Sequence, residues 1–288
     1  MTIDFDLFDS IQKVKKKHSN LYENQSSLDT LIIPDGAEII GRISKIDELL
    51  QYLVPNDKNA IVPPFISCYG KSGTGKSTIV EFVCQKLQEY GIFSGYCFVN
   101  LRKASTIFGC ANLILKQLGT KSLQNANGIA GILENIQFAI ETGITSRGNN
   151  NNNYERTKRA ADDNNNKDKD CHRPRTKMNK GPELFVLALD EYDVIFHDKR
   201  ANPSDFVYGL LTIEEELRKK GLLMSIVAIS DKIAKDYRFD GRVLSRIGHQ
   251  EVYFPPYSNE EIMQILSNRA SQGFSCPVEK EVLEYCAK

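Results

Sequence analysis

The stretch "FISCYGKSGTGKSTIVEFV", Phe65–Val83, decides the fold of this chain, because an apolar run leads into a glycine-rich run and then into an amphipathic run. Gly70, Gly75, Lys76 and Ser77 fit the pattern G-x-x-x-x-G-K-[ST], which is typical of a phosphate-binding loop. A surface turn would account for the glycines, since Gly and Ser are favoured in turns. It would not account for the lysine and the hydroxyl that follow them.

The flanking residues supply the order strand, loop, helix that the pattern requires. "FISCY" predicts a short buried strand. The following helix carries an apolar stripe that ends at Gly91 and consists of Ile79, Val80, Phe82, Val83, Cys84 and Leu87. In such a loop, successive backbone N–H groups can curl around a phosphate chain at the positive end of a helix.

We therefore predict that ATP or ADP binds to this loop. Lys76 would supply a mobile cation for the outer phosphates, and the Ser77 hydroxyl would be a ligand of Mg²⁺. The predicted cofactor-binding residues of the loop are Gly70, Lys71, Ser72, Gly73, Thr74, Gly75, Lys76, Ser77 and Thr78.

Composition limits the remaining possibilities. With 288 residues, of which 41% are hydrophobic, the chain can form a substantial core. We find no apolar run of the roughly 20 residues that span a bilayer and no secretory signal, so we expect a cytoplasmic protein without a membrane partner. The 37 basic and 37 acidic residues give a net charge of zero, which is weak evidence against DNA as a partner.

The seven cysteines form no C-x-x-C pair, and we interpret them as small buried residues in a reducing compartment. Cys171 beside His172 lacks a second pair that would complete a metal site. The run "KVKKKH", Lys13–His18, fits a solvated helix face better than a DNA-binding patch.

Two carboxylates follow a second apolar run, "ELFVLALDEYDVIF", Glu183–Phe196. Five consecutive apolar residues predict a central parallel strand buried on both faces. Asp190 would stand at its carboxyl end, where α/β sheets place ligands, and would hold Mg²⁺ together with Ser77. Glu191 would orient and polarise the water that attacks the terminal phosphate. The alternative is a strand end followed by a helix-capping acid.

A third strand, "LLMSIVAIS", Leu222–Ser230, is followed by Asp231. A polar side chain here would lie between the two phosphate-handling strands and could sense the γ-phosphate or the attacking water. The alternative is a plain junction between strand and loop.

Arg242 and Arg246 flank a short predicted helix before the strand "QEVYF". An arginine at a domain edge can reach a neighbouring subunit's nucleotide and stabilise charge in the transition state. The alternative to this role is a surface ion pair, which we consider about equally good for Arg242 and less good for Arg246. The predicted catalytic residues are thus Glu191, Asp231 and Arg246.

The predicted organisation is an arm over residues 1–35, a nucleotide-binding domain over 36–257 and the beginning of a helical lid over 258–288. Within the domain, residues 146–182 contain almost no large apolar side chain, so we expect a disordered insertion, with a functional basic tether as the alternative. The fold class is α/β, with a central parallel sheet flanked by helices.

From about Gly36 onward the sequence resembles the AAA+ ATPases, and within them the archaeal origin-recognition and replication-initiator family, which is related to eukaryotic origin-recognition subunits and the helicase loader. The resemblance is carried by "IIGRISKIDELLQYLVP", "YGKSGTGKST", "FVNLRKASTIFGCANLILKQLG", "LALDEYDVI", "SIVAISDK", "GRVLSRIG" and "VYFPPYSNEEIMQILSNRA".

The resemblance implies a role for several positions. The segment before the loop would pack against adenine, Asp190 and Glu191 would form the second phosphate motif, and Arg246 would be the arginine finger. The helical stretch Ala104–Leu118 lies where these initiators carry an inserted DNA-contacting helix. Implied partners are double-stranded origin DNA, other AAA+ subunits or copies of this chain, and a replicative helicase.

The sequence departs from the family pattern in three respects. Asp231 stands where the family usually has Asn, which bears on the rate of hydrolysis more than on nucleotide binding. The Asn-rich insertion is foreign to the pattern. The second sensor arginine and the winged helix are missing, so we expect either a fragment or a shortened homologue.

The resemblance implies an ATP-binding initiator of DNA replication that hydrolyses ATP slowly and acts as a switch for assembly on DNA. Two alternatives stay open. One is a non-replicative AAA+ ATPase of signalling or transposition, and the other is a scaffold that binds nucleotide without turnover.

Overall fold

The computed structural model describes residues 39–54, 62–122, 128–143 and 184–287. The predicted arm 1–35, the predicted insertion 146–182, the run Lys13–His18 and the pair Cys171 and His172 lie outside the described residues. The chain divides into two compact units. The larger unit is Lys45–Phe254, and the smaller unit combines Met1–Ser44 with Pro255–Lys288.

The larger unit is built on one five-stranded sheet with the strand order β2-β3-β4-β1-β5, in which every pair is parallel. The strands are β1 (Phe65–Tyr69), β2 (Phe93–Asn100), β3 (Leu184–Asp190), β4 (Leu223–Ser230) and β5 (Glu251–Tyr253). Every residue of β3 is buried, as expected for a central strand that is covered on both faces. The predicted α/β class is therefore confirmed.

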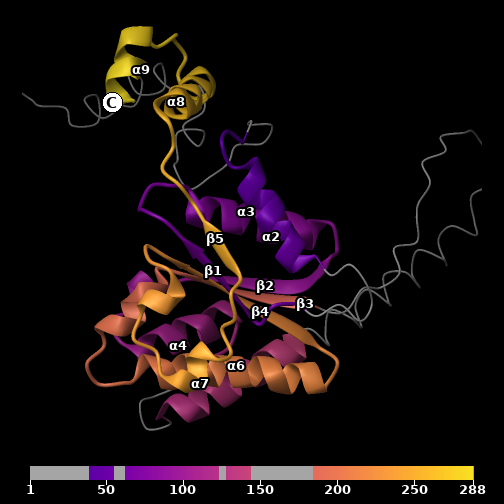
Figure 1. Cartoon of the computed structure of the whole chain (residues 1–288). Coiled ribbons are helices and arrows are strands. Elements are labelled where there is room, and N and C mark those ends of the chain that lie inside the picture. Colours follow the sequence, from indigo (N-terminus) through magenta and orange to yellow (C-terminus); the bar gives the residue numbers. More distant parts are fainter. Residues whose placement is uncertain (1–38, 55–61, 123–127, 144–183, 288) are drawn as a thin grey trace, which may run out of the picture. The chain divides into compact units, whose positions relative to one another are not determined.

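Helices precede or connect these strands and cover the sheet, since parallel strands need long crossover connections (Figure 1). They are α2 (Ile43–Leu53), α3 (Lys76–Glu89), α4 (Ile107–Gln117), a helix over residues 128–143, α6 (Pro203–Lys219) and α7 (Gly241–Leu244). In the described part of the chain, short 3-10 helices follow strands or loops, namely η2 (Leu101–Lys103), η4 (Tyr192–His197) and η5 (Ala234–Asp236).

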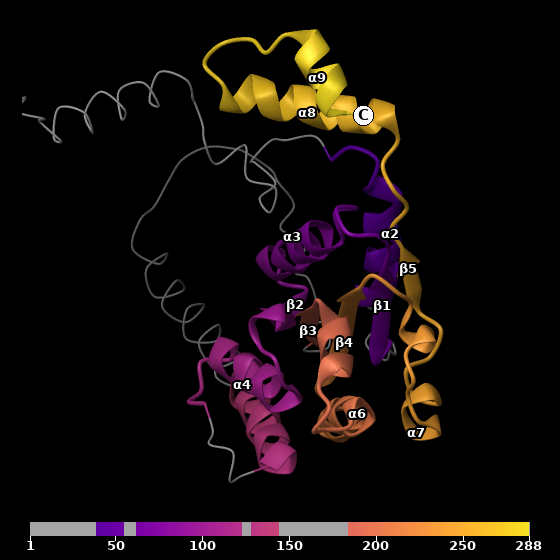
Figure 2. The ribbon, with the colours of Figure 1, turned by 90° about the vertical axis from the view of Figure 1, so that its left-hand side faces the viewer.

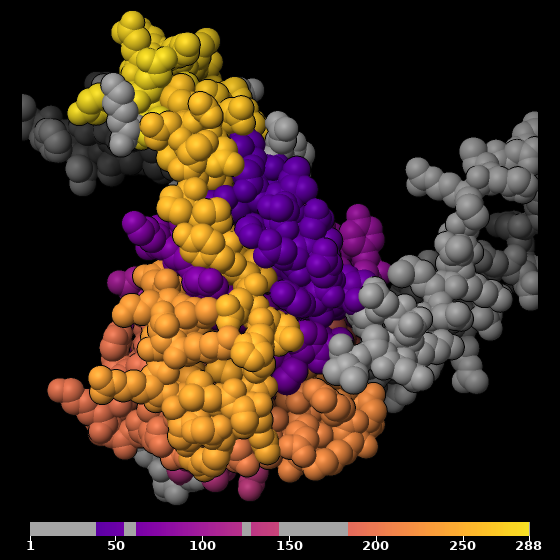
Figure 3. Space-filling model, viewed as in Figure 1, coloured from indigo at the N-terminus to yellow at the C-terminus, as the bar shows by residue number. Residues whose placement is uncertain are grey.

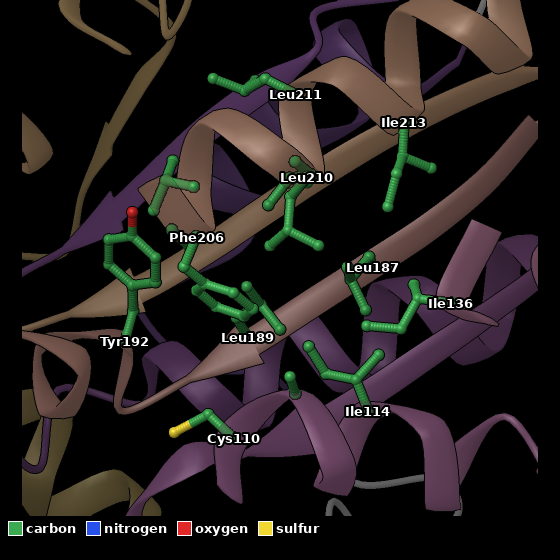
Figure 4. Packing of buried hydrophobic residues seen from close by; sticks show 14 of the residues in the cluster. Cys110, Ile114, Ile136, Leu187, Leu189, Tyr192, Phe206, Leu210, Leu211 and Ile213 are labelled. Carbon is green, nitrogen blue, oxygen red and sulfur yellow. The ribbon is translucent and has the colours of Figure 1, made fainter. Parts of the chain in front are cut away.

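Helix α3 covers one face of the sheet, and α4 and α6 cover the other, as Figure 2 shows. On the second face, side chains of β3, α4 and α6 point toward one another (Figure 4). Leu187 and Leu189 of β3 meet Ile114 of α4 and Leu210 of α6 there, all of them 0–1% exposed. On the surface drawn in Figure 3, the indigo α2 lies beside the light orange segment that contains β5.

Burial tests two of the predictions. Phe82 is only partly buried, although we expected it on the apolar stripe of α3. Cys68, Cys84, Cys97 and Cys110 are buried as predicted, and burial raises the pKa of each thiol. The same prediction is wrong for two cysteines of the smaller unit, which are exposed: Cys276 and Cys286.

Helix α4 is a core element of the larger unit. Ile107, Cys110, Ala111, Ile114 and Leu115 are all fully buried. DNA contact through the stretch Ala104–Leu118 stays a prediction, and only the side chains that this helix leaves outside the core could make it.

The smaller unit contains α8 (Asn259–Gly273) and α9 (Lys280–Cys286), which fall in the predicted lid segment. Ser258 and Glu261 form a capping box at the start of α8. The Arg42 guanidinium lies over the Tyr257 ring at 3.6 Å and donates a 2.7 Å hydrogen bond to the Pro255 carbonyl. Within the four described ranges, no helix is both long and apolar enough to cross a membrane.

Candidate functional site

The loop between β1 and α3 has the backbone of an anion-binding turn. Gly73 and Gly75 both have φ near 82°, in the left-handed region that favours glycine. Gly75 is the N-cap of α3 and supplies no side-chain cap, so the first N–H groups of the helix have no side-chain acceptor at their cap position. The Thr74 hydroxyl braces the loop by donating a 2.8 Å hydrogen bond to the Lys71 carbonyl. Lys71, Ser72 and Gly73 form the exposed side of the loop.

Gly70 begins the loop where the chain passes close to the end of β5. The Phe254 N–H donates a 2.8 Å hydrogen bond to the Tyr69 carbonyl. A Cβ atom on Gly70 would stand 2.3 Å from the Phe254 carbonyl oxygen. Glycine is therefore required here by packing against a backbone atom, in addition to any ligand.

Lys76, the first residue of α3, is buried and uses its ammonium within the site. Its Nζ donates to the Gly70 carbonyl at 2.6 Å and to the Lys71 carbonyl at 3.0 Å. It also donates to the Asp231 carboxylate at 3.1 Å. Since an ammonium has three donors, these contacts account for all of them.

Asp190 ends β3 and joins the loop to the neighbouring strand. It accepts a 2.7 Å hydrogen bond from the Ser77 hydroxyl on one carboxylate oxygen and a 2.8 Å bond from the Asn100 amide on the other. The structure thus brings together Ser77 and Asp190, which are 113 residues apart in sequence. Asp190 is 6% exposed, so its carboxylate is held by these donors instead of by bulk water.

Asn100 was not predicted as a site residue. It is the last residue of β2 and the register partner of Asp190 in the parallel pair β2·β3. Its place at the end of the strand "SGYCFVN" is the sequence signal that could have indicated it, because polar residues at the carboxyl ends of parallel strands share one edge of the sheet.

Glu191 occupies a strained backbone position directly after β3. Its φ of 53° and ψ of 43° are left-handed, and no other described non-glycine residue has a positive φ. A strained backbone persists only where the surrounding structure enforces it, and such positions cluster at functional sites. The Arg102 guanidinium lies 3.8 Å from the Glu191 carboxylate. Desolvation and the neighbouring Asp190 charge raise the pKa of the Glu191 carboxyl above its usual value.

Asp231 stands where the sequence predicts it. It follows β4 directly, and β4 lies between β3 and β1 in the sheet. Its carboxylate is therefore on the same edge as the loop and Asp190, and it contacts Lys76. The sheet order agrees with the predicted position of Asp231 between β1 and β3, and its role as a sensor of the γ-phosphate or the attacking water stays a prediction.

Arg246 lies elsewhere in the larger unit. Its guanidinium is 3.3 Å from the Glu215 carboxylate of α6 and 4.6 Å from the centre of the Tyr208 ring. Arg242 also lies over Tyr208 and pairs with Asp205 and Asp240. Arg246 thus contacts side chains of α6 in the same chain, and its role as an arginine finger stays a prediction. For Arg242 the structure shows the surface ion pair.

The sequence comparison agrees with the motifs. The chain is 25% identical over 287 residues to an ORC1-type DNA replication protein of Desulfurococcus amylolyticus, covering 98% of this chain and 61% of that protein. It is 26% identical over 288 residues to an ORC1-type DNA replication protein of Pyrococcus abyssi, covering 98% of this chain and 57% of that protein. The chain thus spans less than two thirds of these relatives. No protein-family model matches it.

Two solved structures with a similar fold are ORC proteins of an archaeon. The Aeropyrum pernix ORC1 protein in complex with DNA has a TM-score of 0.67 and 21% sequence identity, over 93% of this chain and 59% of that chain. The Aeropyrum pernix ORC2 protein, solved as ADPNP and ADP complexes, has a TM-score of 0.65 and 19% identity, over 93% of this chain and 61% of that chain. At these identities the likeness shows the fold. The resemblance to the ORC1-type DNA replication proteins rests on the sequence relatives.

Proposed function

We propose that this chain binds ATP and ADP with Mg²⁺ at the loop Gly70–Thr78 and acts as an initiator-type ATPase in DNA replication. The observation that carries the proposal is the 2.7 Å contact between the Ser77 hydroxyl and the Asp190 carboxylate, at the end of the loop and of the central strand. Two distant motifs meet there in the arrangement that phosphoryl-transfer sites use.

The donor set at this contact fits a magnesium ion. Both groups present oxygen atoms, and Mg²⁺ prefers oxygen ligands and takes few of them from the protein when phosphate is also bound. Ser77 and Asp190 would hold the ion. When bound, it would neutralise charge on the phosphate chain.

The two adjacent carboxylates are held differently, which supports different roles. Asp190 is fixed by Ser77 and Asn100 on both of its oxygens. Glu191 stands on a strained turn and its side chain is 38% exposed, so water can reach it. Glu191 would accept a hydrogen bond from the attacking water and take its proton as a general base.

The partners are proposed from the relatives. The Aeropyrum pernix ORC1 protein was solved in complex with DNA, and a Drosophila origin-recognition complex was solved bound to DNA. We propose double-stranded DNA as a partner of this chain, together with other AAA+ subunits or copies of itself. Loading of a replicative helicase is an extension of the same proposal.

A second candidate is a scaffold that holds nucleotide without turnover. The ion pair between Lys76 and Asp231 favours it, because the ammonium that would serve the γ-phosphate is already paired with a carboxylate. Phosphate release, measured with and without origin DNA, distinguishes the two. An ATPase releases phosphate, and the scaffold does not.

Titration with fluorescent ATP tests the binding site itself. Lys76→Ala should abolish binding, since it removes the buried cation that faces the loop. Lys219→Ala is the control, because Lys219 is an exposed lysine of α6 outside the loop and should retain affinity. Unchanged affinity in Lys76→Ala would remove this loop as the nucleotide site.

The chemistry needs its own variant. Glu191→Gln should keep affinity for ATP and lose phosphate release, since the amide can still hydrogen-bond to water but cannot take its proton. Undiminished release in this variant would exclude Glu191 as the base.

A further inference from the structure

One contact of the site is not explained by phosphate binding. The Lys76 ammonium donates to two loop carbonyls and to the Asp231 carboxylate, at distances of 2.6, 3.0 and 3.1 Å. Because all three N–H donors are used, an additional anionic oxygen can bind to this ammonium only by sharing or displacing an acceptor. Two of these acceptors are neutral backbone carbonyls, and the third, the Asp231 carboxylate, carries a negative charge.

The pair is asymmetric in its exposure. The Lys76 side chain is 9% exposed and the Asp231 side chain is 60% exposed. The lysine is thus fixed beneath the loop, while the carboxylate stands at the surface and can rotate into water at little cost. If the pair opens, Asp231 is the partner that moves.

Asp231 also adds to a local excess of negative charge. Asp190 and Glu191 lie on the same edge of the sheet, and Asp231 is among the charges that act on Glu191. Lys76 and Arg102 are the cations seen in contact with these three carboxylates among the described residues. A further phosphate group would enter a region where carboxylates outnumber cations.

We propose that Asp231 makes the site select nucleotides by the charge of the terminal phosphate, favouring ADP over ATP, and that the Lys76–Asp231 ion pair opens when ATP binds. The inference rests on the proposed nucleotide site. The backbone N–H groups of the loop serve the inner phosphates, which ADP and ATP share. The γ-phosphate of ATP competes with Asp231 for Lys76 and adds like charge beside its carboxylate.

Calorimetric titration of the full chain with Mg-ADP and with a non-hydrolysable Mg-ATP analogue tests this. In Asp231→Asn, the ratio of the ATP-analogue Kd to the ADP Kd should fall by about tenfold, equivalent to about 1.4 kcal/mol, chiefly through tighter binding of the analogue. Asp231→Ser, which removes the charge with a smaller side chain, should move the ratio in the same direction. Raising the salt concentration should bring the wild-type ratio toward that of Asp231→Asn, because the effect is electrostatic.

Asp236→Asn is the matched control. It makes the same change of charge at an exposed carboxylate five positions along the chain, in η5, and should leave the ratio unchanged. If both nucleotides bind and the ratio is the same in wild type, Asp231→Asn and Asp231→Ser, the selection mechanism is wrong while the nucleotide site stands. If wild type binds neither nucleotide, the proposed function fails as well.

Discussion

The rings of Phe196 and Tyr237 stack in parallel, with their centroids 4.3 Å apart and an interplanar angle of 9°. Phe196 belongs to η4, which follows Glu191, and Tyr237 directly follows η5, downstream of Asp231. The Tyr237 hydroxyl also hydrogen-bonds with the Ser230 side chain at the end of β4. The stack therefore connects the segment that follows β3 and Glu191 with the segment that follows β4 and Asp231.

Truncation of Tyr237 should loosen this connection. Tyr237→Ala should lower the free energy of unfolding by about 2–3 kcal/mol, because a half-buried ring and its stacking partner lose their contacts. Tyr237→Phe keeps the ring and should cost about 1 kcal/mol or less. Urea denaturation of both variants measures the difference. Equal losses would show that the hydroxyl and not the stack carries the stabilisation.

Two glycines of the same loop should respond differently to alanine. Gly70→Ala should cost about 2–4 kcal/mol, since its Cβ would stand 2.3 Å from the backbone oxygen of Phe254. Gly73→Ala should cost about 1 kcal/mol, because its only penalty is a left-handed φ and no atom lies within 4 Å of the added Cβ. The midpoints of urea denaturation give the comparison. Similar costs would mean that β5 does not restrain the loop.

The left-handed backbone at Glu191 should lower the free energy of unfolding of the wild-type protein. Glu191→Gly should raise the free energy of unfolding by about 1 kcal/mol, since glycine adopts φ 53° without the Cβ penalty. The same variant should lose phosphate release. Glu191→Gln keeps the Cβ atom and therefore the backbone strain, so it serves as the control, with stability near that of wild type. A destabilised Glu191→Gly would show that the side chain contributes contacts that outweigh the strain.

Turnover should depend on assembly if Arg246 acts on a neighbouring molecule's nucleotide. Phosphate release per molecule should rise with protein concentration, and Arg246→Ala should flatten that rise while ATP affinity is retained. A finger of this kind contributes about a thousandfold or more to the rate. To act, Arg246 would have to leave Glu215 and Tyr208, which hold it in the structure.

Arg242→Ala is the control for this prediction. Arg242 lies over the same Tyr208 ring but pairs with Asp205 and Asp240, so its loss should leave the concentration dependence in place. Activity per molecule that is measurable, constant across concentration and insensitive to Arg246→Ala would make Arg246 a structural residue.

The sequence by itself determined the parts of the site that are encoded locally. The loop Gly70–Ser77 follows a strand and opens a helix, and its glycine spacing could be recognised without a structure. Asp190 and Glu191 could be placed at a strand end because the apolar run before them is long enough to indicate a central strand. Local spacing and periodicity suffice here, since they report which residues are buried and where an element stops.

Only the tertiary structure decided which strand ends, and which of the side chains on them, lie next to one another. Periodicity identifies a strand but not its neighbours, and the order β2-β3-β4-β1-β5 is set by crossover helices and by packing between distant side chains. That order brings Asn100 to Asp190 and Asp231 to Lys76, which are 90 and 155 residues apart in sequence. It also places Phe254 against Gly70. The left-handed turn at Glu191 and the pairing of Arg246 with Glu215 likewise depend on contacts between elements, which no local pattern records.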